Sequence, residues 1–393
     1  MNILYDQEQK EWGIETETEH DFTFGHNKIS LCQIKNQANT LVKFSVNNNK
    51  KHVGPLIGIM TALRENGILA GNISLFKALQ KEVVKRDGII VIFHYRFLSP
   101  NGISGYIYDN AGSRWILANC PLPDIIYNRI PYRDAEKTVI FQEVISFLRK
   151  ENIPFFNPGF LNKYEQYRIL AQHPEVKKSL PDFIVIKNAE ALENFLAKKQ
   201  KLYIKPADGA KGKGILRLWQ AGGQGILLID KHSSSVFPDF ADFWQQYHSM
   251  FQNQVYLAQM EIEPDIQNGN RYDFRILVHY DDDRYQISGI GVRQAEKNSL
   301  FTHIPNGGSL LPYEAVRTKS HDQFFQTIIS HCGKILTDNL GFFGEFSLDA
   351  AVATNGSYVI YEVNAKPMLF DEAEIEQNRV KNLSRLFFQM SGF

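Results

Sequence analysis

The sequence predicts a chain of α/β and α+β domains that follow a small N-terminal β module. Three observations carry this prediction. The 393 residues exceed what one ordinary hydrophobic core accommodates. Strands alternate with helices from residue 52 onward. Two later stretches, one rich in glycine and one centred on an Asn-Gly pair, have the pattern of β-hairpins. We expect a β module at residues 1–51, an α/β domain at 52–155 and a larger domain at 156–393.

Composition excludes several classes of protein. The 43 basic and 43 acidic residues cancel, which argues against a nucleic-acid partner. No basic start with an apolar core follows Met1, and the longest apolar runs have only strand length. We therefore expect a cytoplasmic protein without a membrane segment. Cys32, Cys120 and Cys332 are far apart and form no Cys-x-x-Cys, so we expect each to be a small buried hydrophobe.

The first 155 residues contain the predicted elements of the β module and the α/β domain. Short strands are expected at 29–34 and 40–46, and a linker at 47–51. The α/β domain is expected to contain strands at 53–60, 89–93, 115–118 and 125–127, with helices at 74–85 and 138–150. This alternation predicts a mostly parallel sheet.

The larger domain opens with a helix at 162–171, for which Asn162 is a suitable N-cap. Lys163 then lies in the first turn, where a cation opposes the helix dipole. Lys163 is either exposed to solvent or held in this position by an interaction with another group. The elements expected further along are strands at 183–186, 202–205, 255–259, 272–280 and 285–293, and helices at 189–198, 239–251, 320–339 and 372–390.

The C-terminal hairpin carries the most informative pattern. If Asn355-Gly356 is a two-residue turn, Asp349 lies directly opposite Glu362, with Asn364 on the same face. The opposite face, which we expect to be the core face, contains Leu348, Ala350, Val352, Val359, Tyr361 and Val363. Two opposed carboxylates repel each other unless a divalent cation lies between them, and oxygen ligands suit Mg²⁺. The alternative is a solvated face with two unrelated acids.

The glycine-rich stretch from 205 to 218 joins two β-like runs. It is neither a Walker A loop nor a dinucleotide-binding fingerprint, because a strand follows it and no Lys-Ser or Lys-Thr pair is present. Such a hairpin can cover a triphosphate with its backbone N–H groups, and Lys205 would add a fixed positive charge. The alternative is a flexible surface hairpin.

Other polar positions could complete a phosphate-binding site. Residues 259–262 form a strand-to-linker junction that can present backbone groups to a purine edge. Asp273 and Arg275 share one strand face, either as a surface ion pair or as ligand contacts. Residues 306–309 are a plain loop or an anion-binding nest. No Ser-His-Asp or Cys-His set is evident, and phosphoryl transfer needs none.

In this order the residues resemble the ATP-grasp superfamily, and within it the YheC/YheD family of endospore coat-associated proteins, over about residues 52–390. The catalytic half is also similar to that of ribosomal-protein glutamate ligases. The resemblance implies an ATP-grasp fold, in which a pre-ATP-grasp α/β domain precedes two α+β subdomains that clamp ATP. The chain departs from common family residues at Asn162, Gln259, Lys366 and Met368.

The resemblance also implies roles for individual residues. ATP would be contacted by Lys163, Lys205, Gly209, Lys211, Gly212, Gly214, Asp273, Arg293 and the backbone of Gln259, Met260, Glu261 and Ile262. A pair of Mg²⁺ ions, with Mn²⁺ as an alternative, would be bound by Asp349, Glu362 and Asn364. Arg275 and Arg293 would be catalytic. The acyl substrate would face Arg275, Asn306, Gly307, Gly308 and Ser309.

The activity implied by the resemblance is that of an ATP-dependent carboxylate–amine ligase acting through an acyl phosphate. Its substrates would be small-molecule or peptide carboxylates and amines, and its partners would include spore-coat proteins. Two alternatives remain open at this point. One is a structural coat-associated protein that binds ATP weakly or not at all, and the other is a small-molecule kinase.

Overall fold

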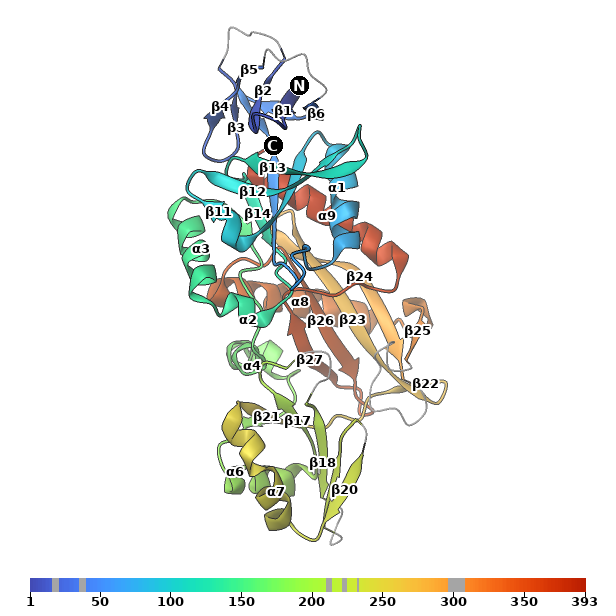
Figure 1. Ribbon diagram of the computed structural model, residues 1–393. Coiled ribbons are helices and arrows are strands. Elements are labelled where there is room, and N and C mark those ends of the chain that lie inside the picture. The colour runs from blue at the N-terminus through green and yellow to red at the C-terminus, as the bar shows by residue number, and fades with distance from the viewer. Residues whose placement is uncertain (16–20, 35–39, 210–213, 221–224, 232, 296–307) are drawn as a thin grey trace.

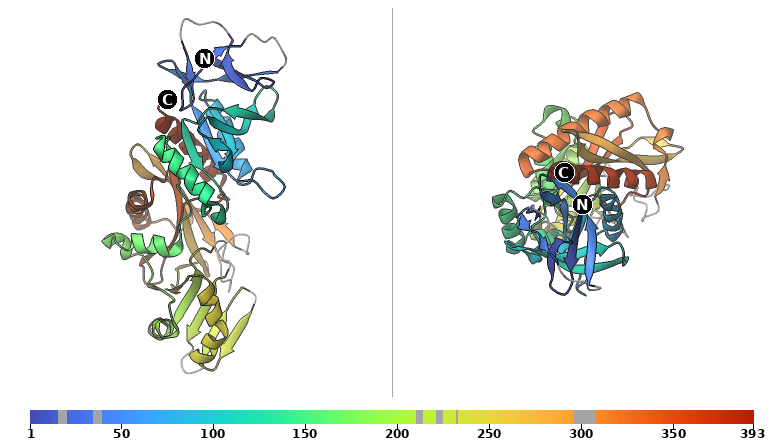
Figure 2. Two further views of the ribbon diagram at one scale, coloured as in Figure 1. Left: turned by 60° about the vertical axis from the view of Figure 1, so that its left-hand side comes forward. Right: turned by 90° about the horizontal axis from the view of Figure 1, so that it is seen from above.

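The chain forms an elongated molecule whose middle part contains the later residues of the sequence, between the N-terminal domains and a distal subdomain (Figures 1 and 2). The computed structural model describes residues 1–15, 21–34, 40–209, 214–220, 225–231, 233–295 and 308–393. The N-terminal strands lie at one end, and the subdomain with α6 and α7 lies at the other. The C-terminal helix returns toward the N-terminal half, so both termini lie near the same end.

Two small sheets make up the N-terminal part, with strand orders β5-β2-β1-β6 and β4-β3-β8-β7. The strands are β1 (Asn2–Asp6), β2 (Glu11–Ile14), β3 (Thr23–Phe24), β4 (Ile29–Ser30), β5 (Cys32–Gln33), β6 (Leu41–Ser45), β7 (Asn47–Asn49) and β8 (His52–Gly54). The linker prediction for residues 47–51 is wrong, because the asparagines of β7 pair with β8. Asparagine has a low strand propensity, and cross-strand pairing overrides it here. Cys120 and Cys332 are buried as predicted, whereas Cys32 is exposed.

The α/β domain is built on one mixed sheet of order β11-β12-β10-β9-β14-β15, with β13 paired to β12. Its strands are β9 (Leu56–Thr61), β10 (Ile89–His94), β11 (Leu98–Ser99), β12 (Gly102–Asp109), β13 (Arg114–Cys120), β14 (Ile125–Asn128) and β15 (Phe155–Phe156), and its helices are α1 (Ile73–Val84), α2 (Arg133–Glu136) and α3 (Val139–Lys150). Strand β9 pairs parallel with β10 and β14, as predicted, and β14 also pairs parallel with β15, a strand that was not predicted. The β11–β13 part is antiparallel, and the glycines within β12 hide this strand from a pattern search.

The distal subdomain is a six-stranded sheet of order β16-β21-β17-β18-β19-β20 with two helices packed on it (Figure 1). Its elements are β16 (Phe183–Val185), α6 (Ala189–Lys199), β17 (Lys201–Pro206), β18 (Leu216–Gln220), β19 (Ile226–Ile229), β20 (Ser234–Phe237), α7 (Phe240–Asn253) and β21 (Tyr256–Met260). The glycine-rich stretch connects β17 to β18, which are antiparallel partners, as the hairpin prediction requires.

The central sheet has the order β25-β24-β23-β26-β27 and lies between the distal subdomain and the α/β domain (Figure 1). The elements of this part are α4 (Lys163–Leu170), α5 (Pro174–Lys177), β22 (Ile266–Gln267), β23 (Asn270–Asp281), β24 (Arg284–Gln294), β25 (Ser309–Leu311), α8 (Lys319–Leu340), β26 (Glu345–Val352), β27 (Tyr358–Asn364) and α9 (Ala373–Ser391). Helix α8 packs on the apolar face that includes Phe274 and Leu348. Helix α9 covers part of the opposite face and also contacts α1.

The predicted helices of the larger domain form with the expected local signals. Asn162 caps α4 by accepting hydrogen bonds from two backbone N–H groups, and Asp239 caps α7. Within the described residues, no helix combines the length and the apolar character that a membrane span requires.

Candidate functional site

The β26–β27 hairpin places two carboxylates opposite each other. Asp349 pairs with Glu362, as predicted from the sequence, and Asn364 Nδ2 donates to Asp349 Oδ2 at 3.2 Å. The predicted turn register is nevertheless wrong, because Val352, not Ala353, pairs with Tyr358. A β-bulge next to Asp349 introduces one extra residue on β27 and restores the predicted pairing beyond it.

The bulge also changes which side chains face the core. Ile360 takes a core position together with Leu348 and Val363, whereas Val359 and Tyr361 do not belong to this core. Tyr361 instead lies next to Glu362 at the edge of a cavity. The prediction that Val359 and Tyr361 belong to the core face is therefore wrong, since the extra residue reverses the alternation between the turn and the bulge.

Two lysines converge on Glu362. Lys163 is the first residue of α4, and its buried Nζ lies 2.5 Å from Glu362 Oε1. This ion pair compensates for placing a cation at a helix N-terminus. Lys205 lies on β17, and its Nζ donates to Gln259 Oε1. Burial lowers the pKa of Lys205 to about 8, although the nearby Glu362 carboxylate opposes this shift.

A cavity of about 230 Å³ lies between the distal subdomain and the central sheet. It is lined by Tyr203, Lys205, Ile215, Gln259, Met260, Ile262, Pro264, Arg271, Tyr272, Asp273, Arg293, Asp349, Tyr361 and Glu362. Six of these were not predicted from the sequence: Tyr203, Ile215, Pro264, Arg271, Tyr272 and Tyr361. Arg271 shares a strand face with Asp273 two residues later, which is a signal that the sequence does contain.

The strand-to-linker junction contributes mainly an apolar wall to this cavity. Met260 N–H donates to the Asp182 carbonyl and Glu261 N–H donates to the Lys201 carbonyl, so the sheet itself occupies these two donors. The Glu261 carboxylate binds Arg217 Nε at 2.7 Å, and Glu261 does not line the cavity. The side chains of Met260 and Ile262, together with Tyr203, form a surface suited to a flat aromatic ring.

The two predicted arginines lie in different surroundings. Arg293 pairs across the strands with Asp273, and both line the cavity. Arg275 is only 6% exposed, does not line the cavity, and lies 5.0 Å from the centre of the Phe370 ring. Its Nε makes no hydrogen bond to the described part of the chain. Burial lowers the pKa of Arg275, and Asp349, its partner across the strands, opposes that shift.

The two glycine-containing loops are described only in part. Lys211, Gly212, Asn306 and Gly307 lie outside the described residues. Gly214 adopts a left-handed φ of 71°, and Gly209 follows the tight turn after β17. Ser309 was expected in a polar loop, but it is an exposed residue of β25 that pairs with Gln294, directly after Gly308. Ser309 is extended because β25 pairs with β24.

The donor set at Asp349, Glu362 and Asn364 fits a hard divalent cation. Within the described residues, no three His, Cys, Asp or Glu side chains cluster, so this candidate site offers two carboxylates and one amide. Mg²⁺ is commonly held by one or two carboxylates together with substrate phosphates and water. The charge on Lys163 partly neutralises Glu362 in the structure described here.

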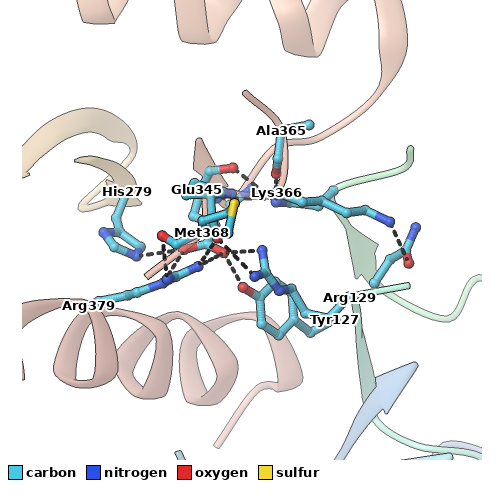
Figure 3. A network of polar contacts seen from close by, with 12 residues as sticks. Tyr127, Arg129, His279, Glu345, Ala365, Lys366, Met368 and Arg379 are labelled. Carbon is cyan, nitrogen blue, oxygen red and sulfur yellow. Dashed lines mark hydrogen bonds and ion pairs between the residues drawn. The ribbon is translucent and has the colours of Figure 1, made fainter. Parts of the chain in front are cut away.

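A buried ionic network lies behind the candidate site and was not predicted from the sequence (Figure 3). Glu345 on β26 accepts two hydrogen bonds of 2.9 Å from Arg379 of α9 and one of 3.1 Å from Arg129, which follows β14. Tyr127 also donates to Glu345. Burial alone would raise the pKa of Glu345, but Arg379 and Arg129 hold it well below its usual range.

This network fixes the loop that follows Asn364. Arg129 and Arg379 both donate to the Pro367 carbonyl, at 2.9 and 3.0 Å. Lys366 reaches into the α/β domain, where its Nζ pairs with Glu136 and donates to Asn128 Oδ1 at 3.0 Å. The contacts of Arg129 with Pro367 and of Lys366 with Asn128 join residues more than 200 positions apart, so no local pattern could reveal them.

Comparison with known proteins agrees with this architecture. Residues 152–391 match the family described as YheC/D like ATP-grasp. The endospore coat-associated protein YheD of Bacillus subtilis strain 168 is 28% identical over 347 residues, covering 82% of this chain and 74% of YheD. YheC of the same strain, also named as endospore coat-associated, is 25% identical over 308 residues, covering 73% of this chain and 84% of YheC.

A solved structure supports the fold assignment. D-alanyl-alanine synthetase A from Vibrio cholerae matches with a TM-score of 0.53 at 11% identity, over 86% of this chain and 98% of that protein. This likeness confirms the predicted ATP-grasp fold. Because the family match also spans more than half of the sequence, the chain belongs to the family of YheC/D-like ATP-grasp proteins.

Proposed function

We propose that this protein is an ATP-dependent carboxylate–amine ligase that converts Mg-ATP to ADP and phosphate. The observation that carries the proposal is the opposed Asp349–Glu362 pair at the edge of a cavity that also receives Lys205 and Arg293. The family membership supports ATP as the nucleotide. The name of the Vibrio cholerae protein, a synthetase that joins amino acids, supports the reaction class.

The cavity has an apolar part and a charged part, as a nucleotide requires. We place the adenine against Met260, Ile262 and Tyr203, and the ribose near Asp273. The polyphosphate would then extend toward the ammonium groups of Lys205 and Lys163, which lie on the side of the carboxylate pair.

Mg²⁺, as a pair of ions or replaced by Mn²⁺, would be held by Asp349, Glu362 and Asn364 and would neutralise the charge that develops on the phosphates. Glu362 must exchange its pairing with Lys163 for this role, and the freed ammonium can then bind phosphate oxygen. The loop fixed by Arg129 and Arg379 holds Asn364 in place from its C-terminal side.

The reaction has two balanced steps. A carboxylate oxygen of the first substrate forms a bond to the γ-phosphorus, and the bond from phosphorus to the β–γ bridging oxygen breaks, releasing ADP. The amine of the second substrate then attacks the acyl carbon, and the bond from carbon to the phosphoryl oxygen breaks, releasing phosphate. We assign Arg293 to the γ-phosphoryl group and Arg275 to the acyl end of the substrate. The two arginines lie on the adjacent strands β24 and β23 and on the same face of the sheet.

Replacement of one carboxylate tests this proposal. The protein is incubated with ATP, Mg²⁺ and a mixture of amino acids and short peptides, and ADP is measured. Glu362→Gln should abolish Mg²⁺-dependent ADP formation, whereas Glu193→Gln on the exposed face of α6 should leave it unchanged. ADP formation at the wild-type rate by Glu362→Gln would refute the site.

Two other functions are separated by simple measurements. A small-molecule kinase would leave the phosphoryl group on its product, whereas a ligase releases free phosphate. A structural role at the spore coat is favoured by the names of YheD and YheC, and spore-coat proteins would then be partners. Calorimetric titration with Mg-ATP that detects no binding would favour the structural role over the ligase.

A further inference from the structure

We infer that Glu372 binds the amine substrate as its ammonium form and accepts the proton that the amine must lose before it attacks. The inference rests on the proposed ligase function and extends it by assigning a residue to the acceptor half of the reaction. Glu372 is the residue that precedes α9, eight positions after Asn364.

The central sheet arranges the reacting groups in one row. Gly291 pairs with Arg275, Arg275 pairs with Asp349, and Asp349 pairs with Glu362, so this row crosses four strands on one face of the sheet. Adjacent strands lie about 4.8 Å apart. The cation site therefore lies at one end of the row, Arg275 lies in its middle, and Gly291 lies at the other end.

Glu372 occupies the space above Gly291. A Cβ atom at Gly291 would lie 2.6 Å from Glu372 Oε1, so the absence of a side chain there admits the carboxylate. Glu372 is in the N-cap position of α9, yet its side chain makes no capping hydrogen bond. Its carboxylate also forms no ion pair within the described part of the chain.

The next position in the row after Gly291 belongs to Arg275. Arg275 is 6% exposed, and its Nε has no hydrogen-bond partner in the described residues. A buried donor without a partner requires an explanation, and a bound anion or water molecule is one. A substrate acyl phosphate at Arg275 would thus lie between the cation site and Glu372, which places Glu372 on the side where the amine approaches the acyl carbon.

The surroundings of Glu372 hold it in this position. Phe370 stacks over Arg275, and Ile375 packs against Gly289 and Leu277 on the same face. Phe370 N–H donates to Glu376 Oε1, and Glu376 pairs with Arg379 of the buried network in Figure 3. The loop that carries Glu372 is therefore fixed at both ends by charged contacts.

The chemistry requires such a group because an amine is protonated near neutral pH. Glu372 accepts one proton from the substrate ammonium, which frees the nitrogen electron pair. That pair forms the bond to the acyl carbon while the bond from carbon to the phosphoryl oxygen breaks. The second proton lost by nitrogen leaves with phosphate, and Glu372 returns its proton to water. The substrate class is a primary amine such as an α-amino group.

The test compares Glu372→Gln with Glu374→Gln, an exposed glutamate two residues further along the chain. Each variant is incubated with ATP, Mg²⁺ and a mixture of amino acids and short peptides, and amide formation is measured. A second incubation also contains hydroxylamine, a neutral nucleophile that needs no base, and there hydroxamate formation is measured. General-base catalysis contributes about 10²–10⁴-fold. We expect Glu372→Gln to lose at least about 100-fold in amide formation and to retain wild-type hydroxamate formation, while Glu374→Gln matches wild type in both.

The pH dependence and a second variant add independent readouts. The deficit of Glu372→Gln in amide formation should shrink as pH rises, because free amine then needs no base. Gly291→Ala, which displaces the carboxylate, should behave like Glu372→Gln. Equal loss of amide and hydroxamate, or wild-type amide formation, overturns the role of Glu372. If the wild-type protein forms neither hydroxamate nor ADP, the ligase function itself is overturned, and the inference with it.

Discussion

Asp349 and Glu362 face each other across β26 and β27, and each carboxylate has a different positively charged neighbour. Lys163 Nζ lies 2.5 Å from Glu362 Oε1, and Arg275 is the cross-strand partner of Asp349 on the other side. These two cations offset the repulsion that opposed carboxylates would otherwise exert. In the proposed function, Mg²⁺ at this pair would compete with Lys163 for Glu362, which would couple cation binding to the lysine that can reach phosphate.

The first prediction concerns the pH dependence of nucleotide binding. Burial lowers the pKa of Lys205 to about 8, so Lys205 carries its charge below pH 8 and loses it as pH rises above 8. The phosphates of ATP favour the charged form of Lys205, so ATP binding should weaken above pH 8. The loss of affinity should approach about tenfold per pH unit. Calorimetric titration with Mg-ATP between pH 6 and pH 10 measures this.

Lys205→Arg provides the control for this prediction, because a guanidinium stays charged throughout this range. The variant should show no weakening of ATP binding above pH 8. An unchanged pH dependence in Lys205→Arg would assign the titration to another group, such as Lys366, whose pKa burial also lowers to about 8.

A second prediction concerns the neighbour of Lys205. Gln259 Oε1 accepts from Lys205, and Gln259 Nε2 donates to Tyr167 Oη at 2.7 Å. Gln259→Glu places a negative charge beside the ammonium and should raise the pKa of Lys205 by about one unit or more. The pH at which ATP binding weakens should rise with it. Tyr167→Phe, which removes the other hydrogen bond without changing charge, should leave that pH unchanged.

A third prediction concerns the stability of the interface between the α/β domain and the central sheet. Glu345 is fully buried and receives hydrogen bonds from Arg129, Arg379 and Tyr127. Glu345→Gln leaves Arg129 without its carboxylate partner and leaves Arg379 with Glu376 alone, and breaking a buried ion pair in this way costs about 3–5 kcal/mol.

Urea unfolding of Glu345→Gln should therefore show a clearly lower midpoint than the wild-type protein. Glu175→Gln is the matched control, because Glu175 pairs with Lys178 on the surface and 59% of its side chain is exposed. That variant should unfold at the wild-type urea concentration. Equal midpoints for all three proteins would mean that the network contributes nothing to stability.

A fourth prediction concerns the glycine inside α8. Alanine is favoured over glycine in a helix by about 1 kcal/mol. A Cβ at Gly333 would however lie 2.3 Å from the Tyr285 ring, and Tyr285 Oη is hydrogen-bonded to Thr337 Oγ1. Overpacking of this kind costs about 1–3 kcal/mol or more, so Gly333→Ala should lower the melting temperature despite the better helix propensity.

Ser330→Ala serves as the control for the α8 prediction, since Ser330 is exposed on the same helix one turn earlier. Its melting temperature should equal or slightly exceed that of the wild-type protein. A higher melting temperature for Gly333→Ala would show that the Tyr285 ring can move aside at little cost.

Local elements of this protein are determined by the sequence alone. The caps Asn162, Asp239 and Thr138 and the apolar spacing behind them specify α4, α7 and α3, because these interactions lie within one helical turn. The Asn355-Gly356 pair likewise specifies a hairpin, although Asp349 and Glu362 face each other only because the bulge on β27 offsets a one-residue error in the predicted turn register. The family resemblance predicted the fold from the same residues.

Tertiary structure alone decided what lies around this pair. The bulge that turns Tyr361 toward the cavity and the ring of Phe370 over Arg275 depend on packing against other elements. The network of Arg129, Glu345 and Arg379 joins residues from three distant parts of the chain. A sequence specifies contacts within a few residues through propensity and period, whereas contacts between distant residues exist only once the whole chain has packed.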